Sequence, residues 1–315
     1  MGPQFFILGT QRSGTTLLRL ILNSHKLVSI PEEASFLKFA LKKNKYSLAN
    51  KNKIYKYLIN DYQLNKWNLP KEKIKEILSM SNTNIDLISN FYSTYKNFFS
   101  KKLVGDKTPP FIRYLSILND YYPEAKYIFI VRDGRDSFLS LRNRNHHSAK
   151  SFVLGGLEWK IKNCLILKNL NNISSDKKII IKYEDLIKNP QKIIIDVCGF
   201  LNIEFQKDML QFWKNSKDFI DKNHSSKIFK PIDSTNLNKW KIGLTDKEIK
   251  KFQYYAEPLL KKYDYEIKKI NITLYNVYLE LITFLFIRLA KITYNSISQI
   301  ISVKFGLSLK KEFYE

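Results

Sequence analysis

Cysteine and histidine are scarce in this sequence, with two cysteines and four histidines among 315 residues. Cys164 and Cys198 form no metal-ligand spacing, and we expect no metal site. Two thiols in so long a chain favour a reducing compartment over a disulfide framework.

Glycine and proline are also few, at ten and nine residues. Without a segment rich in either, no flexible linker divides the chain, and two independent domains are not expected. The 44% of hydrophobic residues suffices for one large core. The first residues show no basic region followed by a long apolar stretch, so we expect no signal peptide and a cytoplasmic protein. One main domain over residues 1–265 is predicted.

Acidic residues are outnumbered, with 29 Asp and Glu against 53 Lys and Arg and a net charge of +24. Such a charge alone suggests that the protein binds nucleic acid, a membrane surface or a polyanionic substrate. However, 45 of these cations are lysines, which is typical of a solvated surface, and no basic motif interleaved with aromatics predicts nucleic-acid binding. Five of the eight arginines fall within residues 113–144. This clustering favours a bidentate anion site.

Three segments share one pattern, a short apolar run followed by a polar turn and a helical periodicity. The runs are residues 4–8, 126–131 and 178–182. Strands that feed crossover helices give this pattern, which predicts a three-layer α/β fold with a central parallel sheet. Residues 37–100, rich in Lys, Asn and Tyr, predict a helical insertion over one end of the sheet, where substrate-binding lids are common.

The C-terminal extension, residues 266–315, has an apolar helical stripe between residues 270 and 292. Glu280 and Arg288 enclose only seven uncharged residues, too few for a membrane-spanning helix. We therefore expect a helix that lies on a membrane surface or contacts a second subunit, as in a homodimer, with a core helix as the alternative.

The loop GTQRSGTT, residues 9–16, has the glycine spacing of a nucleotide-binding P-loop, but Thr15 stands where that loop has lysine. Its backbone N–H groups at the start of a helix still predict an anion site. Arg12 supplies a cation from within the loop, and its planar fork suits a tetrahedral oxyanion. A P-loop nucleotide kinase stays open as an alternative, although it lacks its lysine.

The motifs RSGTTLLRLILNSH, PEEASFL and YIFIVRDGRDSFLSLRNR resemble sulfotransferases that use 3'-phosphoadenosine 5'-phosphosulfate (PAPS), most closely the tyrosylprotein sulfotransferase branch and its bacterial relatives. The likeness covers most of residues 4–36, 103–144, 178–203 and 223–241. It implies a P-loop-like fold and the transfer of a sulfuryl group from PAPS to a hydroxyl acceptor. The product 3'-phosphoadenosine 5'-phosphate (PAP) would be released, and no metal would be needed.

The resemblance also implies a set of donor-binding residues. It places Arg12, Ser13, Gly14, Thr15 and Thr16 at the 5'-phosphosulfate, Arg132, Ser140 and Lys230 at the 3'-phosphate, Tyr183 near the adenine, and Ser226, with Ser225 as a register alternative, near the sulfuryl group. Arg12 and Ser226 would thereby also act on the group in transfer. Arg132 ends a strand and Ser140 lies one turn into the next helix, so both can reach one phosphate.

Sulfuryl transfer needs a base for the acceptor hydroxyl and a cation at the leaving oxygen, and the smaller charge of a sulfuryl group makes a metal dispensable. The resemblance selects Glu33 as the base, with Glu32 as its competitor. It also selects Lys107, in VGDKTPP, as the cation. The alternative for Lys107 is a surface salt bridge with Asp106.

The acceptor is less defined, because residues 37–100 contain no recognisable acceptor motif. We expect a saccharide or glycolipid first, since a helix touching the inner face of the membrane would bring the enzyme to lipid-linked substrates. Peptidyl tyrosine is the second expectation, because the motifs around Glu33 and Lys107 are similar to those of the tyrosylprotein branch.

Overall fold

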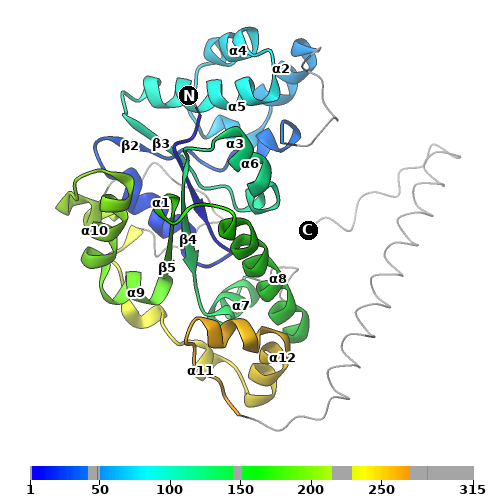
Figure 1. The fold of residues 1–315 in the computed structure, drawn as a ribbon, viewed down its shortest axis with the longest axis vertical. Coiled ribbons are helices and arrows are strands. Elements are labelled where there is room, and N and C mark those ends of the chain that lie inside the picture. The colour runs from blue at the N-terminus through cyan, green and yellow to red at the C-terminus, as the bar shows by residue number, and fades with distance from the viewer. Residues whose placement is uncertain are drawn as a thin grey trace, which may run out of the picture.

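A central sheet of five parallel strands organises the computed structural model, which describes residues 2–41, 48, 50–144, 151–214, 229–269 and 282. The strand order is β2-β3-β1-β4-β5 (Figure 1). The strands are β1 (Phe5–Leu8), β2 (Val28–Ser29), β3 (Leu103–Asp106), β4 (Lys126–Val131) and β5 (Lys178–Lys182). The predicted parallel sheet is confirmed. Strand β2 was not predicted, because two residues carry no periodicity.

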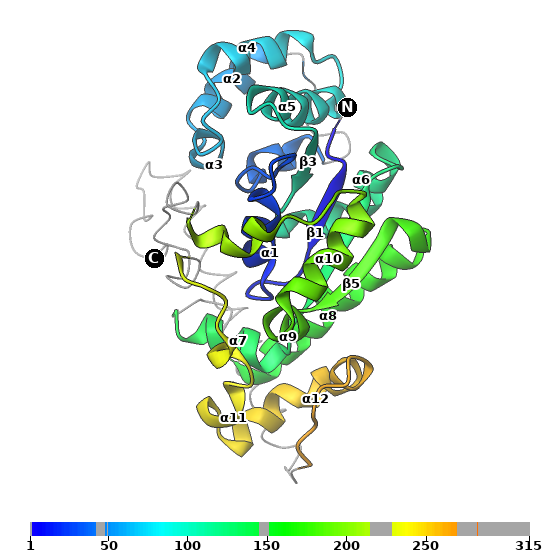
Figure 2. The ribbon, with the colours of Figure 1, turned by 90° about the vertical axis from the view of Figure 1, so that its left-hand side faces the viewer.

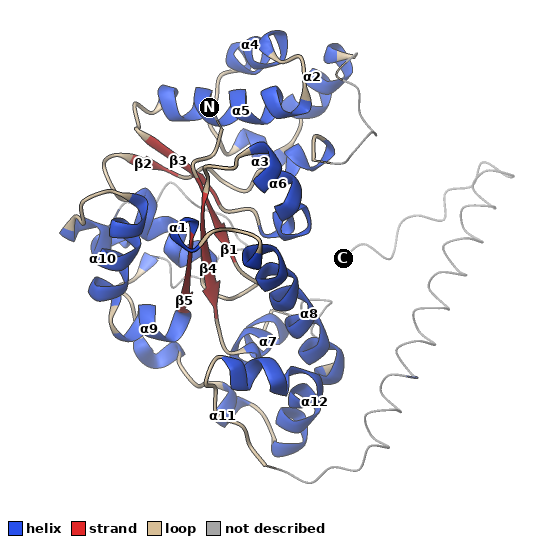
Figure 3. Ribbon diagram, viewed as in Figure 1, coloured by secondary structure: helices blue, strands red, loops and turns tan. Residues whose placement is uncertain are grey.

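The side chains of β1 point alternately to the two faces of the sheet, and each face carries one hydrophobic core cluster. Phe5 and Ile7 belong to one cluster, and Phe6 and Leu8 belong to the other. The first face is covered by α1 (Thr15–Asn23), α9 (Tyr183–Lys188) and α10 (Pro190–Leu201). The second is covered by α6 (Leu115–Tyr121), α7 (Gly134–Arg142), α8 (Phe152–Asn171) and α12 (Asp246–Lys262) (Figure 3). The expected three layers are therefore present.

The expected helical insertion lies at the β2–β3 edge of the sheet, at the opposite end of the molecule from α11 (Trp240–Gly243) and α12 (Figure 2). It comprises η1 (Ser35–Phe39), α2 (Lys51–Ile59), α3 (Tyr62–Asn65), α4 (Lys71–Met80) and α5 (Asn84–Phe98). The Trp67 ring lies at the centre of the insertion. The rings of four residues surround it at centroid distances between 5.1 and 6.1 Å, namely Phe36, Phe91, Tyr92 and Tyr95. This aromatic cluster joins the core on the Phe6 face of the sheet.

Two helices begin directly after a strand. The segment YEDL after β5 is the start of α9, because Glu184 and Asp185 stabilise the N-terminus of a helix. Helix α7 begins at Gly134, where the Asp133 carboxylate accepts the Arg135 backbone N–H at 2.9 Å.

The remaining short 3-10 helices are η2 (Pro109–Tyr114), η4 (Ser175–Lys177), η5 (Lys207–Lys214) and η8 (Ser234–Asn236).

Among the helices in the described part of the chain, none has the length and apolarity needed to cross a membrane. The stripe at residues 270–292, for which membrane or subunit contact was expected, lies outside the described residues apart from residue 282.

Candidate active site

The loop between β1 and α1 is a tight turn held from inside. The Ser13 hydroxyl donates to the Thr10 carbonyl at 2.7 Å, and the Ser13 N–H donates to the same oxygen at 3.2 Å. Arg12 has a left-handed φ of 65° and Gly14 a φ of 100°. A Cβ at Gly14 would lie 2.4 Å from the Tyr183 ring, so only glycine fits there.

The start of α1 leaves backbone donors unused within the helix. The first intrahelical bond runs from the Leu18 N–H to the Gly14 carbonyl at 3.0 Å, and no side chain caps the helix. The N–H groups of Thr15, Thr16 and Leu17 therefore have no acceptor within the helix. Since these residues line the pocket described next, the helix presents an anion-binding N-terminus to it.

A pocket of about 460 Å³ lies in front of this loop. Its lining includes Arg12, Gly14, Thr15, Thr16, Leu17, Arg132, Asp136, Ser140, Asn143, Arg144, Tyr183, Lys230, Asp233 and Lys239. Five of these side chains are cationic and two are carboxylates. A pocket at the carboxyl ends of β1, β4 and β5 is where parallel α/β sheets bind ligands, and its charge selects an anion.

Four of the predicted donor-binding residues contact one another in this pocket. The Arg12 Nε donates to the Ser140 hydroxyl at 3.0 Å, and an Arg132 NH1 donates to the Arg12 carbonyl at 3.0 Å. The Arg132 guanidinium also lies over the Tyr183 ring, 4.3 Å from its centroid. The Arg12 side chain, predicted at the 5'-phosphosulfate, reaches across to α7 and lies beside Arg132 and Ser140, which were predicted at the 3'-phosphate.

Burial and mutual repulsion within this arginine group favour a bound anion. Burial is the largest cause that lowers the pKa of Arg12 to about 10, and the charges of Arg144 and Arg132 contribute to the same shift. A bound anion would relieve that repulsion. Arg144 was not predicted from the sequence, although its position four residues after Ser140, on the same face of the predicted helix, is a usable signal.

The predicted base and the predicted cation contact each other outside this pocket. The Lys107 Nζ donates to Glu33 Oε1 at 2.6 Å, with 1% of the Lys107 side chain and 27% of the Glu33 side chain exposed. The alternative of a surface salt bridge between Lys107 and Asp106 is therefore wrong. Glu33 follows β2 and Lys107 follows β3, and these neighbouring parallel strands bring the two side chains together.

Glu32 has a different environment. Its carboxylate accepts a bond from Arg19 at 2.8 Å, and both side chains are buried. This pairing occupies Glu32 in the core, whereas Glu33 is partly open to solvent.

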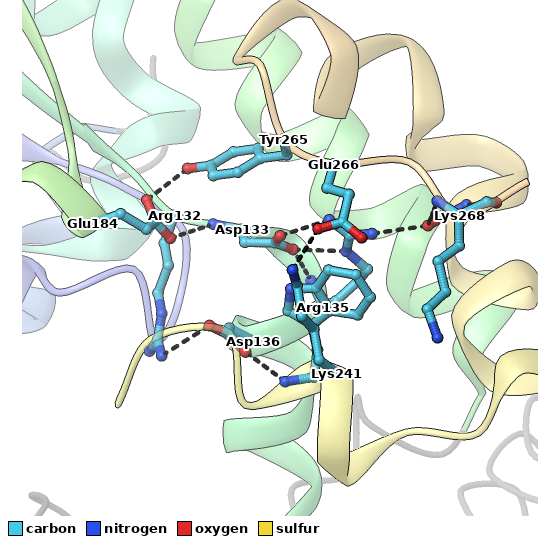
Figure 4. A network of polar contacts seen from close by, with 11 residues as sticks. Arg132, Asp133, Arg135, Asp136, Glu184, Lys241, Tyr265, Glu266 and Lys268 are labelled. Carbon is cyan, nitrogen blue, oxygen red and sulfur yellow. Dashed lines mark hydrogen bonds and ion pairs between the residues drawn. The ribbon is translucent and has the colours of Figure 1, made fainter. Parts of the chain in front are cut away.

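A second ion-pair network fixes the start of α7 (Figure 4). Arg135 is fully buried and donates twice to Asp133, from Nε at 3.0 Å and from NH2 at 2.7 Å. Its NH1 donates to Gln253 on α12 at 2.8 Å, and its guanidinium lies 3.6 Å from the centroid of the Trp240 ring. These contacts tie α7 to α11 and α12, and α7 carries Ser140.

The same network reaches the strand end that carries Arg132. The Asp133 N–H donates to Glu184 at 3.1 Å, and the Tyr265 hydroxyl donates to the other Glu184 oxygen at 2.9 Å. Figure 4 shows Arg132 and Asp136 beside this group, with their charged atoms 3.8 Å apart. The position of Arg132 thus depends on β4, α9 and the segment after α12.

Some predicted residues take other positions. Ser226 and its alternative Ser225 lie outside the described residues. Ser13 is buried within the loop and does not line the pocket, whereas Lys230 and Tyr183 do. The described residues contain no group of three or more His, Cys, Asp or Glu side chains that would hold a metal.

The profile of the sulfotransferase family matches residues 3–207. The chain belongs to this family. This sulfotransferase is 24% identical to protein-tyrosine sulfotransferase 1 of Danio rerio over 283 residues, which cover 84% of the chain and 72% of that protein. It is 21% identical to the protein-tyrosine sulfotransferase of Drosophila melanogaster, again over 84% of the chain, and spans about half of that relative's length, 52%.

A solved structure has the same fold. The sulfotransferase domain of the Synechococcus PCC 7002 olefin synthase matches with a TM-score of 0.66 at 22% identity, over 85% of this chain and 96% of that one. The predicted family, enzyme class and fold are confirmed. The family match also favours a sulfotransferase over the P-loop kinase that the loop alone left open.

Proposed function

We propose that this sulfotransferase moves a sulfuryl group from PAPS to a hydroxyl acceptor and releases PAP. The acceptor oxygen bonds to sulfur as the bond from sulfur to the bridging 5'-phosphate oxygen breaks, and the acceptor proton passes to Glu33. The observation that carries this proposal is the pocket of about 460 Å³ with five cationic side chains in front of the α1 N-terminus. An adenylate with anionic groups at both its 3' and 5' positions matches that charge.

The residue roles follow from this placement. The donor would be bound by the backbone of Gly14, Thr15 and Thr16 and by the side chains of Arg12, Arg132, Ser140, Arg144, Tyr183 and Lys230, with Ser226 near the sulfuryl group. Ser13 would support the loop from inside. Lys107 has three N–H donors and uses one on Glu33, so the others are available for the leaving oxygen. Charge on that oxygen develops only as the bond breaks, and its stabilisation accelerates the chemical step.

For the acceptor we propose peptidyl tyrosine ahead of a saccharide or glycolipid. The relatives in Danio and Drosophila are named protein-tyrosine sulfotransferases, which supports the phenolic hydroxyl of tyrosine as the acceptor group. The saccharide preference depended on the stripe at residues 270–292, which lies outside the described residues. A phenol with a pKa of about 10 also loses its proton to a carboxylate more readily than an alcohol does.

PAP alone is expected to stabilise the protein without metal. At a hundredfold excess over its dissociation constant it adds about 2.7 kcal/mol to the free energy of unfolding, which raises Tm by roughly 4 °C in a chain of this size. Thermal unfolding with PAP, with adenosine 5'-phosphate and with ATP plus magnesium measures this. Stabilisation by magnesium ATP greater than that by PAP would contradict the donor assignment.

Label from ³⁵S-PAPS is expected to move onto tyrosine peptides. The measurement is transfer to a panel of tyrosine peptides, glycans and glycolipids, with phenylalanine versions of the peptides as matched controls, because they lack only the acceptor oxygen. Label found on glycans or glycolipids and absent from the peptides would reverse the proposed acceptor order and leave the donor assignment intact.

A further inference from the structure

The Thr108 hydroxyl joins the two segments that carry Glu33 and Lys107. Thr108 is 2% exposed, and its Oγ1 accepts the Ala34 backbone N–H at 2.8 Å. Ala34 directly follows Glu33, and Thr108 directly follows Lys107. One hydrogen bond therefore ties the neighbour of the proposed base to the neighbour of the proposed cation.

The orientation of this hydroxyl is set by a buried carboxylate. Thr108 Oγ1 donates to Asp106 Oδ2 at 2.7 Å, and the Tyr92 hydroxyl of α5 donates to the same oxygen at 2.6 Å. An ionised carboxylate only accepts, so the Thr108 proton points to Asp106 and a lone pair remains for Ala34. Burial raises the Asp106 pKa to about 6, while the bonds from Tyr92 and Thr108 oppose that rise. The carboxylate therefore stays mostly ionised at neutral pH.

Two further side chains hold the backbone on the other side of Glu33. Arg19 on α1 donates to the Pro31 carbonyl at 3.1 Å, and Trp67 Nε1 donates to the Glu32 carbonyl at 2.9 Å. The segment around Glu33 is thus fixed from α1 and from the insertion. The bond that the Ala34 N–H donates to Thr108 connects the backbone of this segment to the strand end that carries Lys107.

We propose that Thr108 is a positioning residue, whose hydroxyl holds the Glu33 carboxylate and the Lys107 ammonium in register across β2 and β3. Asp106 at the end of β3 orients this hydroxyl, and Tyr92 in the insertion orients Asp106. The inference rests on the proposed roles of Glu33 and Lys107. A fixed spacing matters because a displacement of about 1 Å in a reacting group can cost on the order of 10²-fold in rate.

The test compares Thr108→Val with Thr108→Ser. Valine keeps the shape and removes the hydroxyl, and serine keeps the hydroxyl and removes the methyl group. With ³⁵S-PAPS and the panel acceptor that the wild type labels best, Thr108→Val is expected to lower kcat by roughly 10- to 100-fold. Thr108→Ser is expected to restore most of it. The PAP dissociation constant should be unchanged in both variants, because the donor pocket does not include Thr108.

Equal kcat for Thr108→Val and the wild type would overturn the inference, and so would equal losses in the valine and serine variants, which would assign the effect to packing. If Thr108→Val does not fold, Tyr92→Phe is used, which removes the other donor to Asp106 and keeps the ring. It should lower kcat in the same direction without weakening PAP binding, and an unchanged kcat would again overturn the inference. Failure of the proposed function is distinct, because the wild type would then neither bind PAP nor transfer label.

Discussion

Glu33→Gln is expected to lower kcat for sulfuryl transfer by about 10²- to 10⁴-fold while the PAP dissociation constant stays the same. Glutamine has nearly the same shape as glutamate, and its amide oxygen can still accept a bond from Lys107. It cannot take a proton from the acceptor. Because Glu33 lies outside the donor pocket, the loss should appear in the chemical step alone.

The matched control for this variant is Glu32→Gln, one residue away. Glu32 is paired with the buried Arg19, so its neutralisation leaves a buried guanidinium without its counter-charge and should lower the free energy of unfolding. The kcat of the folded Glu32→Gln protein should stay near that of the wild type. Initial rates with ³⁵S-PAPS, PAP titrations and denaturant unfolding separate the two effects. Transfer that survives in Glu33→Gln and vanishes in Glu32→Gln would exchange the roles of the two acids.

The sheet and the phosphate-binding loop were predictable because their signals are local. Residues 126–131 and 178–182 are continuous apolar runs, and the structure forms strands with those bounds. The glycines of residues 9–14 identify a turn into a helix, and the φ of 100° at Gly14 shows why glycine is needed there. Such features depend on a few neighbouring residues, which a sequence displays directly.

The contacts within the candidate site were not predictable, since they join segments that are distant in the chain. Glu33 and Lys107 are 74 residues apart and meet only because β2, too short for a pattern, pairs with β3. Arg12 and Ser140 are 128 residues apart. A resemblance assigns each residue a role, but it does not show which side chains contact each other, such as those of Arg12 and Ser140.

Arg132→Lys is expected to weaken PAP binding by roughly 10- to 100-fold, which corresponds to the 1.5–3 kcal/mol typical of a hydrogen bond to a charged group. Lysine keeps the positive charge but has no planar fork, so it cannot donate twice to one phosphate or lie flat over the Tyr183 ring. The kcat at saturating PAPS should change little, because Arg132 is proposed to bind the donor, whereas Glu33 and Lys107 are proposed to act in the chemical step.

Comparison of two nucleotides locates the effect at the 3'-phosphate. Adenosine 5'-phosphate lacks that group, so Arg132→Lys should bind it about as well as the wild type does, while PAP binding falls. Arg113→Lys is the matched control, since Arg113 is exposed and does not line the pocket, and it should leave both affinities unchanged. Arg132 also donates to the Arg12 carbonyl, and a purely supporting role would disturb the loop for every ligand. An equal loss for both nucleotides would therefore assign Arg132 to the support of the loop.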